Sequence, residues 1–180
     1  MIILITGATH TGKTVLAQRL LEKYHYPYLS IDHLKMGLIR SGQTSLTVYD
    51  NQKLTEYLWP IVREIIKTAV ENDQNLIVEG CYVPYDWRKD LEQCYLSAIR
   101  FICLAMTDHY IETYYDKIEE YSSVLEHRLA TGDLTIETIR QDNKACLAGF
   151  RQQGETVTLI DEDYQQTIES LLEDMALDKE

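Results

Sequence analysis

Residues 7–14 read Gly-Ala-Thr-His-Thr-Gly-Lys-Thr and match every fixed position of the phosphate-binding pattern G-x-x-x-x-G-K-[ST]. The apolar run of residues 2–6 precedes this segment, and an amphipathic helical pattern follows it from Val15. In such a context, glycines let successive backbone N–H groups surround an anion, and the helix N-terminus adds partial positive charge. The segment therefore predicts a site for the phosphates of a nucleotide.

The last two residues of the motif have separate expected roles. Lys13 is expected to reach the β- and γ-phosphates and to take part in catalysis, whereas the Thr14 hydroxyl is expected to ligate the Mg²⁺ that bridges them. The residues predicted to bind the nucleotide are Gly7, Ala8, Thr9, His10, Thr11, Gly12, Lys13, Thr14 and Val15. The competing interpretation is a glycine-rich turn without a ligand, which the flanking strand and helix patterns disfavour.

Length and charge restrict the partners of this chain. Its 180 residues suffice for one compact domain, residues 1–180, with a hydrophobic core. The formal net charge of −12 disfavours a nucleic acid polymer or an anionic membrane as partner, because both need a basic surface. A small anion held in a local basic pocket is compatible with this charge. We expect a monomer or a homodimer.

The cysteines and the N-terminal segment give further expectations. The four cysteines are scattered, without a C-x-x-C pair or histidines at zinc-finger spacing, which favours neither a metal cluster nor a disulfide framework. The chain begins with an apolar run rather than a basic leader, and no stretch approaches the ~20 apolar residues of a membrane span. We therefore expect a cytoplasmic protein.

Short apolar runs alternate with helical patterns along the chain. The runs predicted to be strands are residues 2–6, 28–31, 76–79, 99–105 and 156–160. This alternation predicts an α/β fold with three layers, in which helices cover both faces of a five-stranded parallel sheet. Because ligands of such sheets bind beyond the carboxyl ends of the strands, functional residues are expected to follow the strands.

Two helical patterns have ambiguous features. An apolar face extends from Leu54 to Val70, but Pro60 interrupts it, so we expect a kink or two helices that meet near Trp59. Tyrosines at helical spacing, Tyr110 and Tyr114 among them, form a stripe on which a nucleotide base could stack. We favour the alternative, in which this stripe packs in the core.

Asp32 follows the second predicted strand, in the segment Ser30-Ile31-Asp32-His33. In a sheet of this winding, a carboxylate there lies across the crevice from the phosphate loop. It could accept a proton from an attacking hydroxyl, bind the acceptor or help to position Mg²⁺. The alternative is a helix N-cap, which we consider less favoured. His33 is expected to face solvent.

Glu79 ends the third predicted strand and places a second carboxylate at the same edge of the sheet. It could hold a magnesium-bound water or contact the acceptor. The alternative is a structural acid that is bonded to the phosphate-loop backbone or to Lys13. Gly80, which follows it, would permit a close approach of the chain to a ligand.

Arginines are scarce, so their positions are informative. Arg40 and Arg88 follow the second and third predicted strands, where an acceptor would bind. Arg128 lies in a polar stretch, residues 121–133, that has the character of a lid, and Arg140 lies on the helix beyond it. A guanidinium from a closing lid would stabilise the transferring phosphoryl group, so we expect Arg128 to be catalytic and nucleotide-binding. Arg140 is the next choice, and for each arginine the alternative is a solvated surface position.

The phosphate loop, Asp32 and Glu79-Gly80 together resemble the P-loop small-molecule kinases of the nucleoside monophosphate kinase superfamily, which includes adenylate kinase, shikimate kinase and chloramphenicol phosphotransferase. The resemblance spans most of the chain, although only the phosphate loop is highly specific. It implies a parallel sheet in the order 2-3-1-4-5, a small helical lid that closes over ATP and Mg²⁺, and phosphoryl transfer to a small acceptor.

Departures from the adenylate kinase pattern bear on the acceptor. Adenylate kinases typically carry Asp-Gly-Phe-Pro after the third strand, whereas this chain has Glu79-Gly80-Cys81-Tyr82-Val83-Pro84. Their lid carries several arginines, whereas the expected lid of this chain holds Arg128 alone. The segment of residues 131–143, which ends in Arg140-Gln141-Asp142-Asn143, does look like the arginine-and-acid stretch beyond the adenylate kinase lid. So few cations argue against a phosphorylated acceptor, because two anions that meet at one site need dense positive charge. Asp32, directly after the second predicted strand, looks more like the hydroxyl-phosphorylating branch, in which a matching aspartate contacts the acceptor hydroxyl. The sequence therefore predicts a kinase, with a P-loop ATPase or a nucleotide-dependent switch for a protein partner as the alternative.

Overall fold

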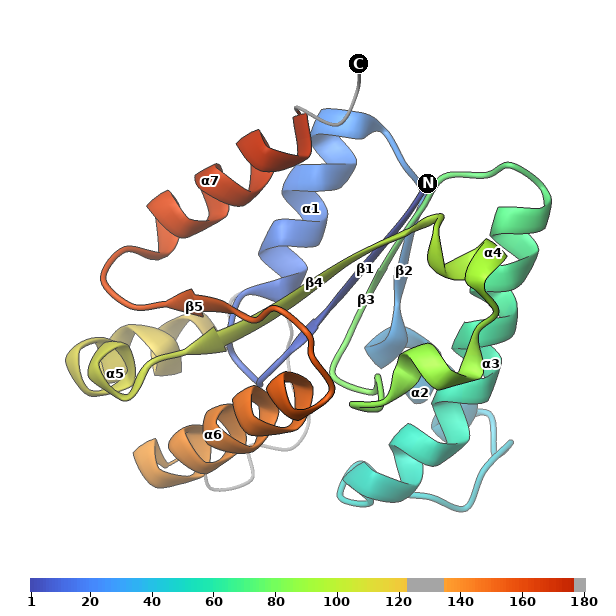
Figure 1. Ribbon diagram of the computed structural model, residues 1–180. Coiled ribbons are helices and arrows are strands. Elements are labelled where there is room, and N and C mark those ends of the chain that lie inside the picture. The colour runs from blue at the N-terminus through green and yellow to red at the C-terminus, as the bar shows by residue number, and fades with distance from the viewer. Residues whose placement is uncertain (123–134, 177–180) are drawn as a thin grey trace. The chain divides into compact units, whose positions relative to one another are not determined.

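The computed structural model describes residues 1–122 and 135–176 (Figure 1). The chain divides into two compact units. The first unit comprises Met1–Thr6 and Lys13–Cys103, and the second comprises Gly7–Gly12 and Leu104–Glu180. Each unit is described by itself below. The prediction of one domain over residues 1–180 stays a prediction.

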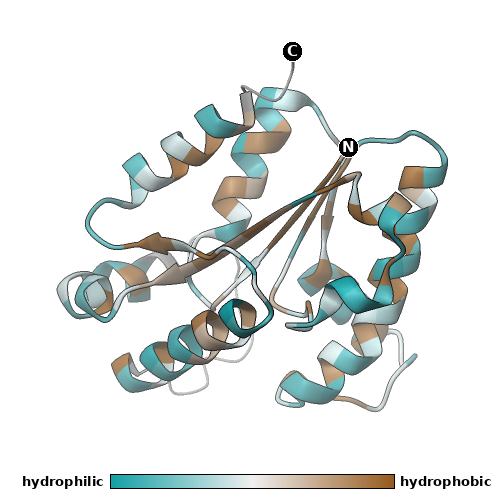
Figure 2. Ribbon diagram, in the orientation of Figure 1, coloured by the Kyte–Doolittle hydropathy of each residue, from teal (hydrophilic) through white to brown (hydrophobic). Residues whose placement is uncertain are grey.

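The strands form one five-stranded sheet in the order β2-β3-β1-β4-β5, which confirms the predicted α/β fold and strand order. Parallel pairing joins β1 to β3, β2 to β3 and β4 to β5. The strands are β1 (Ile2–Gly7), β2 (Tyr28–Ser30), β3 (Leu76–Glu79), β4 (Ile99–Met106) and β5 (Thr158–Ile160). Figure 2 shows the predominantly hydrophobic colour of these strands, as expected where parallel strands are buried on both faces.

Four strand boundaries differ from the predicted ones: β1 and β4 each extend one residue further, to Gly7 and Met106, whereas β2 and β5 are shorter than the predicted runs. The second strand ends at Ser30, because the Ser30 hydroxyl accepts a hydrogen bond from the backbone N–H of His33 at 3.4 Å and a helix begins at Ile31. The fifth strand begins at Thr158 rather than at residue 156. The backbone N–H of Glu155 still donates to the Phe150 carbonyl at 3.0 Å, so the turn that ends the preceding helix extends to the residue just before the predicted run.

The helices of the first unit surround β1, β2 and β3. They are α1 (Lys13–Tyr24), α2 (Ile31–Arg40), α3 (Asn51–Glu71), the short 3₁₀ helix η1 (Trp87–Asp90) and α4 (Gln93–Leu96). Helix α1 contacts β2 and β3, and α2 contacts β2 and α3. Trp87 is fully buried, with its ring stacked on Phe101 at a centroid distance of 5.0 Å and edge-on to Trp59 at 6.4 Å. These aromatic rings form a core beneath α3.

Helix α3 continues through Pro60, so the expectation of two separate helices is wrong. Pro60 is exposed, whereas Trp59, which precedes it, and Val62, two residues after it, are buried. The apolar face predicted from Leu54 onward is confirmed, since Leu54, Leu58, Val62, Ile66 and Ala69 are buried. Burial of this face keeps the helix intact despite the lost hydrogen bond.

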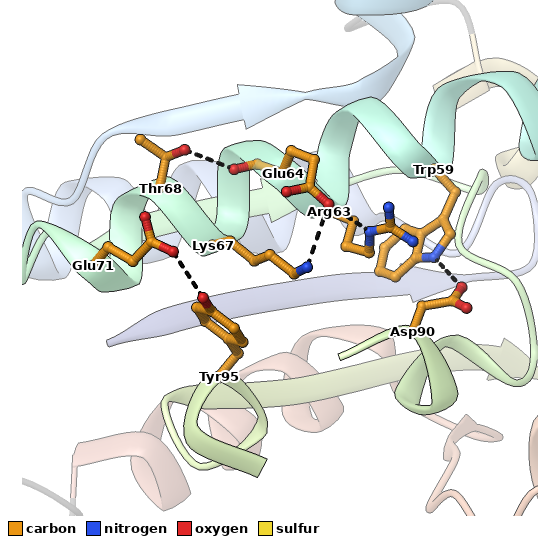
Figure 3. A network of polar contacts seen from close by, with 8 residues as sticks. All are labelled: Trp59, Arg63, Glu64, Lys67, Thr68, Glu71, Asp90 and Tyr95. Carbon is orange, nitrogen blue, oxygen red and sulfur yellow. Dashed lines mark hydrogen bonds and ion pairs between the residues drawn. The ribbon is translucent and has the colours of Figure 1, made fainter. Parts of the chain in front are cut away.

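Polar contacts tie α3 to the segment that contains η1 and α4 (Figure 3). The Trp59 indole N–H donates to Asp90 at 2.8 Å, and the Tyr95 hydroxyl donates to Glu71 at 2.7 Å. The ammonium group of Lys67 lies 5.5 Å from the centre of the Tyr95 ring. The long helix is therefore bonded to this segment near its middle, at Trp59, and at its C-terminal end, at Glu71.

The second unit contains α5 (Asp108–Ser122), α6 (Ile136–Gln152), α7 (Tyr164–Ala176) and β5. Its core consists of Met106, Ile111, Ile118, Ile139 and Ile160, and Tyr110, Tyr115, Ile136 and Tyr164 pack against it. This supports the core interpretation of the tyrosine stripe. Helix α5 has a break at Tyr114, where φ is −119° and ψ is 20°, which the sequence pattern did not indicate. Among the described helices, none is both long and apolar enough to span a membrane.

Candidate active site

The phosphate loop joins the end of β1 to the start of α1, as predicted. Gly7, His10 and Gly12 have φ values of 136°, 63° and 74°, so the backbone turns sharply through left-handed conformations. The Thr11 hydroxyl donates to the Ala8 carbonyl at 2.8 Å and closes the turn from within. The backbone N–H of Ala8 donates to the Leu104 carbonyl at 3.0 Å. Left-handed residues in a loop let backbone N–H groups point into a concavity of the kind that binds anions.

Two residues of the second unit hold the loop segment Gly7–Gly12. The Asp142 carboxylate accepts hydrogen bonds from the backbone N–H of Thr9 at 2.6 Å and from its hydroxyl at 2.9 Å. The Tyr164 hydroxyl donates to the Gly12 carbonyl at 3.2 Å. Neither contact was predicted. Asp142 belongs to the stretch that resembles adenylate kinase, but the periodicity that identifies Tyr164 as a helix residue gives no signal that it contacts a loop 152 positions away.

Lys13 is the buried cation of the first unit, with 7% of its surface exposed. Burial acts to lower the pKa of Lys13, but the negative charges available at Cys81 and Glu79 outweigh it and raise the pKa above its usual value. Asp32 adds to this effect. The structure therefore brings together three predicted site residues, Lys13, Asp32 and Glu79, and adds Cys81, which the sequence analysis did not single out.

Glu79 is the more deeply buried of the two predicted carboxylates, with 1% of its surface exposed. Burial raises the pKa of its carboxyl group, against the opposing effects of a hydrogen bond from Tyr28 and of the charge of Lys13. The Tyr28 hydroxyl donates to Glu79 at 2.7 Å. This surrounding matches the alternative of an acid that interacts with Lys13, and the role in binding metal or acceptor stays a prediction. The space beside Gly80 is occupied by Ile31, whose Cβ would lie 2.7 Å from an added Cβ.

Asp32 lies in the first turn of α2, one residue beyond the start of the helix. The N-cap is Ser30, so the alternative of Asp32 as the cap is wrong. Instead, the Asp32 carboxylate is paired through Oδ1 with the ammonium group of Lys35. Its Oδ2 atom has no hydrogen-bond partner among the residues that the structure describes. His33 is exposed, as expected.

Lys35 also contacts Tyr82, which follows the third strand. Its ammonium group donates to the Tyr82 hydroxyl at 2.9 Å and lies 4.9 Å from the centre of the Tyr82 ring. Burial acts to lower the pKa of Lys35, but Asp32 and Tyr82 outweigh it and raise the pKa. Sequence reasoning missed both residues, although the three-residue spacing from Asp32 to Lys35 in a helix places them on one face.

The predicted arginines lie in different surroundings. Arg40 is exposed at the end of α2, and the guanidinium group of Arg88 lies over the Trp87 ring at 4.5 Å. In the second unit, Arg140 is paired with Glu112, while its Nε is buried without a hydrogen-bond partner among the described residues. Arg128 and almost all of the predicted lid, residues 121–133, lie outside the described residues.

The donor atoms of this site fit Mg²⁺ bound together with a nucleotide. Among the described residues, no group of three or more histidine, cysteine or acidic side chains is arranged to hold a metal ion by itself. Mg²⁺ keeps several waters and takes phosphate oxygens, so it needs few ligands from the protein. Thr14, Asp32 and Glu79 supply hydroxyl and carboxylate oxygens, which are the donors that Mg²⁺ prefers.

Comparison with known proteins gives no sequence relative but a clear fold. No protein-family model matches the sequence, and no curated protein matches it either. Shikimate kinase from Bacteroides thetaiotaomicron is 15% identical, with a TM-score of 0.61, over 98% of this chain and 98% of that chain. Deoxyadenosine kinase from M. mycoides is 15% identical, with a TM-score of 0.58, over 98% of this chain and 99% of that chain.

A gluconokinase from Sinorhizobium meliloti 1021 is 17% identical, with a TM-score of 0.52, over 99% of this chain and 97% of that chain. At this level of identity the likeness concerns the fold, and it extends over nearly the whole length of each protein. The chain therefore has the fold that these solved small-molecule kinases share.

Proposed function

We propose that this protein is an ATP- and Mg²⁺-dependent phosphotransferase, a kinase that moves the γ-phosphoryl group of ATP to a small acceptor. The observation that carries the proposal is the burial of Lys13 beside Asp32 and Glu79, where β1, β2 and β3 end. Burial of charged groups is unfavourable unless they are paired, and a buried charged cluster at this edge of a parallel sheet lies where ligands of such sheets bind. The acceptor is a nucleotide, a nucleoside or another small hydroxyl compound.

The roles of the loop residues follow from phosphoryl-transfer chemistry. Lys13 would contact the β- and γ-phosphates, and the backbone N–H groups of the loop would surround them. Bound Mg²⁺ would neutralise charge on these phosphates, with Thr14 as its predicted ligand and with Asp32 and Glu79 as further candidates. Because phosphoryl transfer depends chiefly on alignment and charge, these residues would act by holding the phosphates in place.

Asp32 is the proposed base or orienting group for the acceptor. As the acceptor oxygen bonds to the γ-phosphorus, the bond from that phosphorus to the β,γ-bridging oxygen breaks and ADP leaves with the electron pair. The hydroxyl proton would pass to Oδ2 of Asp32, since Oδ1 is occupied by Lys35. Arg40 and Arg88 are proposed acceptor contacts, and Arg128 or Arg140 would supply charge to the transferring group.

The proposal also includes the expected domain organisation, location and partners. We retain a single domain with a lid at residues 121–133, a cytoplasmic location and a monomer or homodimer. The partner is a small molecule rather than a nucleic acid polymer or a membrane, in keeping with the net charge of −12. The names of the similar solved structures, which denote kinases of small hydroxyl compounds, support this class of acceptor.

The first experiment is to measure ADP release from Mg-ATP with a panel of nucleoside monophosphates, nucleosides, sugars and small acids. We expect one class of acceptor to stimulate release. Lys13→Ala should then lower the rate by about 10²-fold or more, because it removes a preorganised charge at the phosphates. Normal ATP binding and turnover by Lys13→Ala would refute the proposal.

Asp32→Asn separates a kinase from the alternatives. We expect this variant to lose roughly 10²-fold or more in transfer while it still binds ATP, because it keeps the side-chain shape but cannot accept a proton. Slow hydrolysis that is equal across the whole panel, with or without acceptor, would instead indicate a P-loop ATPase or a nucleotide-dependent switch that acts through a protein partner.

A further inference from the structure

Lys35 is a partly buried lysine on the same turn of α2 as Asp32. Its side chain is 11% exposed, whereas the Asp32 side chain is 23% exposed. The ammonium group is held on one side by Asp32 Oδ1 and on another by the Tyr82 hydroxyl at 2.9 Å. Tyr82 is 7% exposed, and the centre of its ring lies 4.9 Å from the ammonium nitrogen.

A second pair in the chain shows what an ordinary pair of this kind looks like. Asp50 and Lys53 have the same order and spacing, but their charged atoms are 3.8 Å apart and the Lys53 side chain is 71% exposed. Exposed pairs of this type contribute little, because water and salt screen them. Lysine is seldom buried, and burial of its charge is unfavourable unless partners compensate for it. The Asp32–Lys35 pair therefore needs an explanation other than helix stability.

The two oxygen atoms of the Asp32 carboxylate have different surroundings. Oδ1 is engaged by Lys35, and Oδ2 has no hydrogen-bond partner among the described residues. A carboxylate that is tied at one oxygen cannot rotate freely, so its second oxygen is held in one direction. Tyr82, in turn, fixes the end of the lysine chain, whose several rotatable bonds would otherwise allow it to leave.

We infer that Lys35 is a positioning residue, which holds Asp32 Oδ1 so that Oδ2 is presented to the acceptor hydroxyl, and that Tyr82 keeps Lys35 in place. This inference rests on the proposed function. It adds two residues to the site, both of which act through Asp32 and need not touch the acceptor.

The test compares steady-state kinetics of four variants with Mg-ATP and with whichever panel compound most stimulates ADP release. Lys35→Met removes the charge but keeps much of the length of the side chain, and Lys35→Arg keeps the charge. Tyr82→Phe removes one hydroxyl. Lys53→Met, which breaks the exposed pair of the same spacing, is the matched control.

For Lys35→Met we expect kcat to fall by roughly 10- to 100-fold, because misplacement of a reacting group has effects of this size. The KM for ATP should stay within about twofold of that of the unmodified protein, since Lys13 and the loop are unchanged. Lys35→Arg should restore most of kcat, Tyr82→Phe should lower kcat by a smaller factor, and Lys53→Met should have no effect.

Two results would overturn the inference. One is normal kcat in Lys35→Met, and the other is a fall in kcat that Lys35→Arg does not restore and that is matched by a fall in the melting temperature. If Lys35→Met does not fold, Tyr82→Phe decides, and an unchanged kcat in that variant counts against the inference. Failure of the proposed function looks different, because then the unmodified protein itself transfers nothing to any panel compound.

Discussion

Gly12 occupies a position of the phosphate loop at which an added Cβ has no room. Its φ is 74°, a value that side chains other than glycine rarely adopt, and an ideal Cβ there would lie 2.1 Å from the Tyr164 hydroxyl. Gly42 has the same φ of 74°, but no heavy atom within 4 Å of its ideal Cβ. The two glycines therefore separate the cost of the backbone conformation from the cost of the contact.

We predict that Gly42→Ala lowers the free energy of unfolding by about 1–2 kcal/mol and leaves ATP affinity unchanged. Gly12→Ala should cost more, because Tyr164 must move as well, and should weaken ATP binding by about tenfold or more. Urea unfolding and equilibrium titration with Mg-ATP measure both effects. Equal behaviour of the two variants would show that the contact with Tyr164 does not matter.

The identity of the charged residues at the site was predictable, but not their partners. Lys13, Asp32 and Glu79 could be found because the motif and the strand ends mark their places in the sequence. Lys35 was not found, because a lysine one turn beyond an aspartate is ordinarily a surface residue. Only the tertiary structure shows that this lysine is mostly shielded from solvent, with its side chain 11% exposed and bonded to Tyr82.

Helix α3 and the segment that contains η1 and α4 are joined by a hydrogen bond from the Tyr95 hydroxyl, whose pKa can be measured (Figure 3). The Tyr95 hydroxyl donates to Glu71, and this bond raises the pKa of Tyr95 from 10.0 to about 12. The raised pKa means that the neutral phenol is favoured in the folded state. Its contribution to stability is complete below pH 10.0 and is lost as the pH rises toward about 12.

We predict that Glu71→Gln lowers the pKa of Tyr95 toward its usual value, because the negatively charged acceptor is removed. An NMR titration with isotope-labelled tyrosine measures this pKa, and Tyr95→Phe identifies the signal among those of the 13 tyrosines. The alkaline unfolding midpoint of Glu71→Gln should move to lower pH. A Tyr95 pKa that is the same in both proteins would mean that the bond to Glu71 is absent in solution.

The elements themselves were largely predictable, and their ends were not. Alternation of apolar runs and helical patterns gives all five strands, because each buried strand leaves a short continuous run of apolar residues. The side-chain cap by Ser30 moves the end of β2 by one residue, and no periodicity reveals it. Two separate helices that meet near Pro60 were one of the expected outcomes, but α3 is a single helix. The local effect of proline on a helix does not take account of the tertiary packing that buries Trp59 and Val62.

The fold of the chain as a whole follows from one specific motif and the order of the elements around it. At 15 to 17% identity to the solved kinases described above, the likeness concerns the fold and does not extend to the acceptor. The acceptor was not predictable for the same reason, because specificity depends on the shape of a pocket built from residues that differ among proteins of one fold. Binding of nucleotide, by contrast, can be tested on the intact chain without knowledge of the acceptor.

We predict that Mg-ATP raises the melting temperature of the protein. A ligand at about 100 times its Kd stabilises the folded state by ~2.7 kcal/mol, which corresponds to a rise of roughly 5–10 °C for a chain of this size. Differential scanning calorimetry measures the shift. EDTA should reduce it, since ATP without Mg²⁺ retains more of its charge, and Lys13→Ala should abolish most of it.

The same calorimetric scan examines the domain organisation. One transition whose calorimetric and van't Hoff enthalpies agree is the outcome that the prediction of a single domain requires. Two transitions would indicate that the two units unfold separately.

A shift of equal size in Lys13→Ala and in the unmodified protein would contradict binding at the phosphate loop, because the only substituted group is the cation proposed to contact the phosphates. A Gly42→Ala sample, weakened at a site remote in sequence from the loop, should show a lower melting temperature but the same shift with Mg-ATP.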